Sequence, residues 1–167
     1  MGVHRLPATD AISRLAGFDT IIDARSESEF AEDHLPGAVN WPVLNDAERH
    51  AIGCEYKQVS PFAARKRGAA LVSRNIALHV ETHVQPLQRE WKPLVYCWRG
   101  GQRSGSLSLV LGQIGFSVQV LEGGYQAFRR AVIAELEQLP AKLDFRVLCG
   151  RTARGSSASR AAARVRR

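Results

Sequence analysis

A cysteine that precedes a glycine-rich, cationic loop is the most chemically suggestive feature of this sequence. A strand-like segment over 93–96 runs into Cys97, and the next residues read Trp-Arg-Gly-Gly-Gln-Arg-Ser before a helical pattern begins. A thiol in that position lies over a helix N-terminus, among backbone N–H groups and two guanidinium groups. This environment favours the thiolate and any anion brought to it. We therefore predict a reactive Cys97, the alternative being a small buried residue that ends a strand.

The other two cysteines do not share this setting. Neither Cys54 nor Cys149 is followed by a pair of adjacent glycines between two arginines, so both are interpreted as structural. Three widely spaced cysteines do not form a disulfide framework, and we expect a reducing, cytoplasmic location. The N-terminus lacks the apolar segment of a signal peptide, and no apolar run is long enough for a membrane span, so no membrane association is expected.

Length and charge indicate one ordinary globular domain with a basic tail. The chain has 167 residues, 45% of them hydrophobic, and a net charge of +7. Six arginines and no acidic residue fall within 150–167, so the remaining basic and acidic residues nearly balance. The basicity is therefore a property of the tail, which we expect to be solvated and disordered, and it does not by itself indicate nucleic-acid binding.

Strands and helices alternate along the chain, which predicts an α/β fold with a parallel sheet flanked by helices on both faces. Strands are expected over 20–23, 38–40, 93–96 and 117–121. Helices are expected over 26–32 and 45–51, from 61 onward, after the Cys97 loop, and from 124 to near 140. Ser26 with Glu29 forms a capping box, Ser60-Pro61 is a helix start, and Gly115 is a helix end.

The apolar spacing of the three longer helices predicts which side of each faces the sheet. The residues expected to be buried are Phe62, Ala69, Val72, Ile76 and Val80 in the first, Leu107, Val110, Leu111 and Ile114 in the second, and Tyr125, Phe128, Val132 and Leu136 in the third.

Several motifs, in order, resemble the rhodanese domain. They are Asp23-Ala-Arg25 with Glu29-Phe30, then His34-Leu-Pro-Gly-Ala38, the Cys97 loop, and Leu121-Glu-Gly-Gly-Tyr125, and they span most of residues 5–138. The segments Tyr56-Lys-Gln58, Ser60-Pro-Phe62, Cys97-Trp-Arg-Gly-Gly and Glu122–Arg129 are more specific. They are similar to the rhodanese part of the tRNA 2-selenouridine synthase family.

This resemblance implies a transferase that moves selenium or sulfur through Cys97. In that family, selenium from selenophosphate replaces the sulfur of 2-thiouridine at the tRNA wobble position. Geranyl diphosphate supplies the geranyl group of a geranylated thiouridine intermediate. The implied partners are tRNA and the selenium donor, with no tightly bound cofactor. The anion-binding residues are expected to be Arg99, Gly100, Gly101, Gln102, Arg103 and Ser104 in the loop, together with Asp23 and Arg25 at a neighbouring strand end. For Asp23 and Arg25 a purely structural ion pair is an equal alternative.

The sequence departs from the family after the rhodanese-like part. We expect a rhodanese domain over 1–139, the start of a truncated phosphate-binding-loop domain over 140–152, and a basic Ala- and Arg-rich tail over 153–167. A strand-like run over 144–149 leads to Gly150, but no lysine follows at the spacing that a phosphate-binding loop requires. A truncation, a frameshift or a natural short form would each explain this departure.

Two other functions fit part of the pattern. Five residues separate Cys97 from Arg103, the spacing of cysteine-dependent phosphatases, although no aspartate near the loop offers a general acid. A non-enzymatic interaction module is the third possibility. The five histidines show no ligand spacing with the cysteines, so no metal site is expected.

Overall fold

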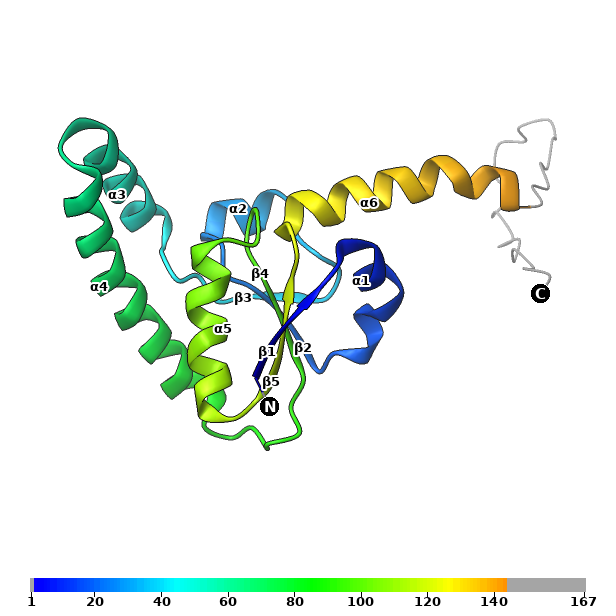
Figure 1. The fold of residues 1–167 in the computed structure, drawn as a ribbon, viewed down its shortest axis with the longest axis horizontal. Helices are drawn as coiled ribbons and strands as arrows, with labels where there is room; N and C mark the ends of the chain where they lie inside the picture. Colours follow the sequence, from blue (N-terminus) through cyan, green and yellow to red (C-terminus); the bar gives the residue numbers. More distant parts are fainter. Residues whose placement is uncertain (1, 144–167) are drawn as a thin grey trace, which may run out of the picture. The chain divides into compact units, whose positions relative to one another are not determined.

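The computed structural model describes residues 2–143, which form a five-stranded, entirely parallel sheet. Its strands are β1 (Gly2–Leu6), β2 (Thr20–Asp23), β3 (Ala38–Asn40), β4 (Pro93–Tyr96) and β5 (Ser117–Leu121), in the spatial order β1-β5-β4-β2-β3 (Figure 1). Strand β4 is central, so its carboxyl end, where Cys97 follows, is flanked by the ends of β5 and β2. In an open parallel sheet, ligands bind at this edge.

At least one helix follows each strand along the chain. The helices are α1 (Ala8–Arg14), α2 (Glu27–Glu32), α3 (Asp46–Gln58), α4 (Pro61–His79), α5 (Gln102–Ile114) and α6 (Gly124–Gln138), with short turns of helix at Leu15–Gly17, Val80–Val84 and Leu139–Lys142. The chain divides into two compact units, and α6 crosses from the first, ending at Val132, into the second. The site described below belongs to the first unit.

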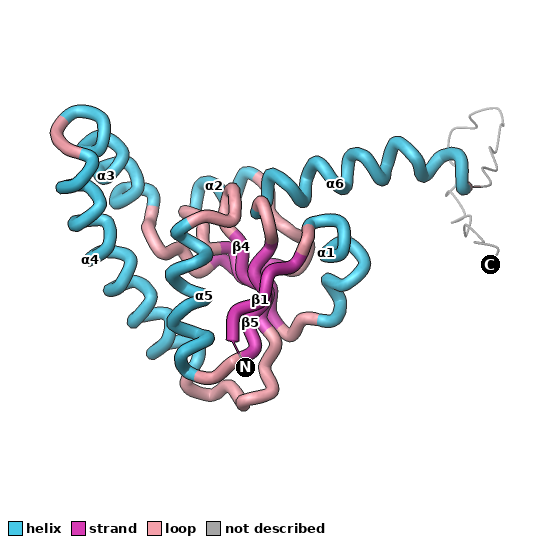
Figure 2. The backbone as a smooth tube through the Cα atoms, viewed as in Figure 1, coloured by secondary structure: helices cyan, strands magenta, loops and turns pink. Residues whose placement is uncertain are grey.

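Alternating side chains of β4 point to opposite faces of the sheet and enter two different cores. Val95 packs with Leu107 and Leu111 of α5 and with Ile76 of α4. Leu94 and Tyr96 pack on the other side, with side chains of α1 and the beginning of α6. Figure 2 shows the strands enclosed between helices. Both faces of the sheet are therefore covered, which confirms the predicted fold class.

Each strand expected from the sequence is present with the expected bounds, but β1 and α1 were not expected. The pattern over 2–6 did not indicate a strand because β1 lies at the sheet edge and buries only Leu6. Helix α1 follows Pro7 and fully buries only Ala11, so it lacks a clear apolar stripe.

The expected helix boundaries are mostly confirmed. Ser26 and Glu29 form the capping box of α2, and Ser60 caps α4 by accepting a hydrogen bond from the Ala63 N–H at 3.4 Å. Gly115 ends α5 with a φ of 119°, which favours glycine. Helix α3 is longer than expected, because it continues past residue 51 to Gln58.

The predicted buried faces are only partly right. Ile76, Leu107, Leu111, Tyr125 and Phe128 are buried as expected. Phe62, Ala69, Ile114 and Leu136 are exposed. In α4 the buried positions are instead Ala64, Gly68 and Ile76, because Gly68 lies against Ile52 of α3 where the two helices cross.

The strand-like run from 144 and the arginine-rich tail lie outside the described residues. Within 2–143, no helix has both the length and the apolar character needed to cross a bilayer.

Candidate functional site

Cys97 lies where the central strand gives way to the loop 98–101 that leads into α5. Its Sγ is 3.2 Å from the hydroxyl of Ser104, in the first turn of that helix. The same hydroxyl lies 3.3 Å from the Gly101 carbonyl, to which it can donate. The sulfur and the start of α5 are therefore brought together as the sequence predicted.

The thiol is less exposed than an open nucleophile would be. Cys97 is 3% exposed and belongs to the same cluster as Leu107 and Leu111. One side of the sulfur meets the Ser104 hydroxyl, so it does not face hydrocarbon alone. The sulfur is therefore only slightly accessible, at the point where the loop joins the central strand.

The beginning of α6 holds the loop in place. The Tyr125 N–H donates to the Cys97 carbonyl at 2.8 Å, and the Gln126 N–H donates to the Trp98 carbonyl at 3.1 Å. These bonds turn two loop carbonyls toward α6. Within residues 2–143, the N–H groups from Arg99 to Gln102 have no acceptor. Free N–H groups at the start of a helix form an anion-binding geometry.

Two glycines permit this close contact between the loop and α6. Gly124 has a φ of 60°, and a Cβ there would lie 2.1 Å from the Cys97 carbonyl oxygen. Gly100 has a φ of 66°, and its Cβ would lie 2.9 Å from the Leu121 carbonyl oxygen. Gly124 was not among the predicted site residues. Its signal was the Gly-Gly pair after β5, which sequence reasoning interpreted only as a turn.

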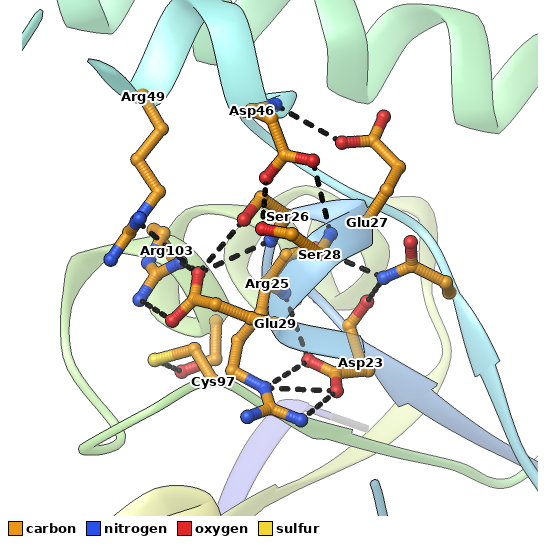
Figure 3. A network of polar contacts seen from close by, with 12 residues as sticks. Asp23, Arg25, Ser26, Glu27, Ser28, Glu29, Asp46, Arg49, Cys97 and Arg103 are labelled. Carbon is orange, nitrogen blue, oxygen red and sulfur yellow. Dashed lines mark hydrogen bonds and ion pairs between the residues drawn. The ribbon is translucent and has the colours of Figure 1, made fainter. Parts of the chain in front are cut away.

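Arg103 is held by a carboxylate that was not among the predicted site residues. Its guanidinium lies 2.6 Å from Glu29 of α2, and Arg49 of α3 approaches the same carboxylate at 3.2 Å (Figure 3). Burial raises the pKa of Glu29, but the hydrogen bond and charge of Arg103, with the charge of Arg49, outweigh it and lower that pKa below its ordinary value. An ionised Glu29 therefore fixes Arg103 beside the loop.

Two polar side chains at the loop face solvent. Arg99 and Gln102 are exposed, and within the described chain the Arg99 guanidinium has no ion-pair partner. Arg99 is thus the loop cation that is free to meet an incoming anion, whereas Arg103 is already neutralised by Glu29.

Asp23 and Arg25 form a buried ion pair at the end of β2. Arg25 Nη2 and Nε lie 2.7 Å and 3.0 Å from Asp23 Oδ2, and both residues are at most 1% exposed. The Arg25 guanidinium also donates to the Asp33 carbonyl at 2.6 Å and lies 4.3 Å from the centre of the Tyr125 ring. These contacts engage both carboxylate oxygens of Asp23 and the Nε and Nη2 atoms of Arg25, as in a structural ion pair.

Tyr125 links this ion pair to α6. Its hydroxyl donates to the Asp33 carboxylate, and burial together with that bond raises the pKa of Tyr125 to about 12. Its ring stacks on Trp98 with a centroid separation of 5.7 Å. The ring of Trp98, the first residue of the loop, therefore lies against the beginning of α6.

Among residues 2–143, no cluster of three or more His, Cys, Asp or Glu side chains could hold a metal ion. The arrangement offers instead one thiol, unpaired backbone N–H groups and one free cation. Such a site can bind a small anion against a sulfur nucleophile.

Comparison with known proteins shows which family the chain belongs to. The model of the rhodanese-like domain matches residues 8–131, which include every element from α1 to the first turns of α6. The chain belongs to the rhodanese-like domain family.

Curated relatives within this family are longer proteins. The chain is 37% identical over 147 residues to the tRNA 2-selenouridine synthase of Alcanivorax borkumensis and 39% identical over 123 residues to that of Chromohalobacter salexigens. These matches cover 86% and 73% of the chain, but only 40% and 34% of the relatives. The chain therefore corresponds to about two fifths of their length.

Solved structures show the same fold. The N-terminal domain of a candidate ATP/GTP binding protein from Clostridium difficile 630 is 32% identical, with a TM-score of 0.62 over 77% of this chain and 98% of that one. A rhodanese-related protein from Thermoplasma volcanium is 18% identical with a TM-score of 0.50, over 76% of this chain and 91% of that one, and shares the fold alone.

The contact between the loop and α6 predicts a large effect of a single methyl group. Gly124→Ala should lower the free energy of unfolding by at least about 1–2 kcal/mol, because its backbone is left-handed and its Cβ would overlap the Cys97 carbonyl. Urea denaturation followed by circular dichroism measures this. Gly53→Ala, in a helix with open space around the glycine, should be neutral or stabilising. Equal stability of the two variants would contradict the contact.

The buried ion pair predicts a second stability effect. Asp23→Asn should lower the free energy of unfolding by about 3–5 kcal/mol, since it leaves the Arg25 guanidinium buried without its counter-charge. Asp10→Asn, on the exposed side of α1, serves as the matched control, and thermal unfolding compares the two. An Asp23→Asn variant as stable as the control would contradict this prediction, because Arg25 would then not depend on the charge of Asp23.

The burial of the sulfur predicts an order of thiol reactivity. In a Cys149→Ser background, a bulky maleimide should modify half-buried Cys54 faster than Cys97, which is 3% exposed. Peptide mass mapping over time measures both rates in one sample. Faster labelling of Cys97 would show that the loop opens readily.

Proposed function

We propose that this chain transfers selenium or sulfur through Cys97, as the rhodanese-like part of a tRNA 2-selenouridine synthase. The observation that carries the proposal is the Cys97 sulfur next to the Ser104 hydroxyl, beneath a loop whose N–H groups are unpaired. The similarity of most of the chain to tRNA 2-selenouridine synthases supports selenium as the physiological chalcogen.

A thiosulfate-type donor illustrates how the site works. The Cys97 thiolate attacks the outer sulfur of the donor, a sulfur–sulfur bond forms, and sulfite leaves with the electron pair of the bond that breaks. The enzyme then carries a persulfide anion on Sγ. The unpaired N–H groups of the loop stabilise that anion, as an oxyanion hole stabilises developing charge.

Each nearby residue has a role in this proposal. When the thiolate forms, the Ser104 hydroxyl turns its hydrogen from the Gly101 carbonyl to the sulfur. Arg99 attracts the anionic donor, and Glu29 keeps Arg103 in position without leaving excess positive charge at the loop. Selenophosphate is the selenium donor that the family resemblance implies, and wobble 2-thiouridine of tRNA is the acceptor. The family resemblance also implies geranyl diphosphate as a substrate.

A phosphatase reaction is less well supported. The carboxylates of Asp23 and Asp33, which lie at the same edge of the sheet, are bonded to Arg25 and to Tyr125. Asp23 is paired with a guanidinium, and the hydrogen bond from Tyr125 lowers the pKa of Asp33, so both are poor proton donors for the leaving group in phosphate ester cleavage.

Donor treatment tests the proposed function. After incubation with thiosulfate, intact mass spectrometry should show the gain of one sulfur atom in the native chain and in the matched Cys54→Ser variant, and no gain in Cys97→Ser. Ser104→Ala should load at least about tenfold more slowly, because the thiolate loses its hydroxyl partner. Loading that survives Cys97→Ser, or aryl phosphate hydrolysis that requires Cys97, would contradict the proposal.

A further inference from the structure

The turn that joins α3 to α4 exposes large apolar side chains that no part of the described chain covers. We call residues 56–67 the hairpin tip. Tyr56 is 46% exposed, Val59 75% and Phe62 68%. Helix α3 has no buried residue over its 13 positions and packs on α4, so the two helices project together from the sheet (Figure 1). Apolar groups gathered at such a projection indicate a binding surface.

The hairpin tip is also strongly basic. It carries Lys57, Arg65, Lys66 and Arg67, all exposed, and no acidic residue. Glu55, just outside it, pairs with Arg67 at 3.3 Å, and no other ion pair to these cations occurs within residues 2–143. The Lys66 ammonium lies 5.0 Å from the centre of the Phe62 ring. Cations and exposed aromatic rings thus occupy the same surface.

We propose that the hairpin tip binds RNA, with its cations on backbone phosphates and with Phe62 or Tyr56 stacked on unpaired bases. This combination of a basic surface with aromatic rings is how proteins hold single-stranded nucleic acids and RNA loops. The absence of any acidic residue over 56–67 favours a polyanion over a protein partner of mixed charge. The inference rests on the proposed function, because it names the surface that receives the RNA substrate.

Helix α3 connects this surface to the reactive cysteine. At its N-terminal end, Asp46 accepts hydrogen bonds from Ser28 at 2.6 Å and 3.0 Å, and Arg49 pairs with the Glu29 that holds Arg103. At its other end, α3 reaches the hairpin tip. Thirteen helical residues span about 20 Å, a distance that an RNA stem and loop can bridge and a small anionic donor cannot. The tip therefore suits a macromolecular substrate that also reaches the Cys97 loop.

Binding of an unmodified tRNA transcript to the full chain tests the inference, with fluorescence anisotropy at several salt concentrations as the readout. Phe62→Ala should weaken binding by about 5- to 150-fold with an unchanged salt dependence, the range expected for loss of one stacked base. Lys57→Gln with Lys66→Gln should weaken binding and reduce the slope of log K against log salt by about 1–2, because phosphate contacts are lost.

The matched control carries Leu109→Ala and Arg14→Gln, an exposed apolar and an exposed basic residue on other helices. It should bind tRNA like the native chain. All variants are also compared after the six arginines over 151–167 are changed to glutamine, so that the tail cannot mask the tip. Tip variants that bind tRNA as well as this control would overturn the inference. So would tip variants that retain RNA binding and lose only self-association in sedimentation, because the tip would then be a protein interface.

Sulfur loading of Cys97 in the same variants separates this inference from the proposed function. Normal loading with tRNA binding that is insensitive to the tip would overturn the RNA surface alone. Weakened tRNA binding in the tip variants with no loading in any protein would support the RNA surface and overturn the chemistry proposed for Cys97.

Discussion

The contact between the start of α6 and the loop after β4 is the constraint on which the site depends. Two N–H groups of α6 bind the Cys97 and Trp98 carbonyls, and Gly124 allows the two backbones to approach closely. The loop carbonyls are thereby occupied on one side, and its N–H groups remain unpaired. The anion-binding character of the loop thus comes from a segment about 25 residues further along the chain.

A second layer of contacts fixes the charge around the loop. Glu29 joins three helices, because it belongs to α2, binds Arg103 of α5 and pairs with Arg49 of α3. Helices α2 and α3 also exchange hydrogen bonds at their N-terminal ends, where Ser28 donates to Asp46 and the Asp46 N–H donates to Glu27. Acidic side chains there complement the partial positive charge of each helix end. Glu29, which completes the capping box of α2, is therefore also the carboxylate that positions Arg103 beside the loop.

The sequence predicted correctly the elements that have a strong local pattern of apolar or capping residues. The sequence-based predictions failed where the burial of a side chain depends on residues distant in the sequence. Strands β2 to β5 and the capping residues Ser26 and Ser60 carry their signals within a few positions. Strand β1 is an edge strand with one buried side chain, and Phe62 looks like a core residue although it lies on a projecting tip. At the site, the Cys97 loop was found from its own residues. The pairing of Arg103 with Glu29 joins residues 74 positions apart, which local spacing cannot reveal.

The most direct test of the account is the fate of selenium at one residue. After treatment with selenosulfate, whose outer selenium the Cys97 thiolate attacks while sulfite leaves with the bonding electron pair, proteolysis and mass spectrometry should locate one selenium atom on the peptide that contains Cys97, with none on Cys54 or Cys149. That result would show that the sulfur below the loop accepts the chalcogen. Selenium found only on another cysteine, or on none while the protein remains folded, would contradict the account.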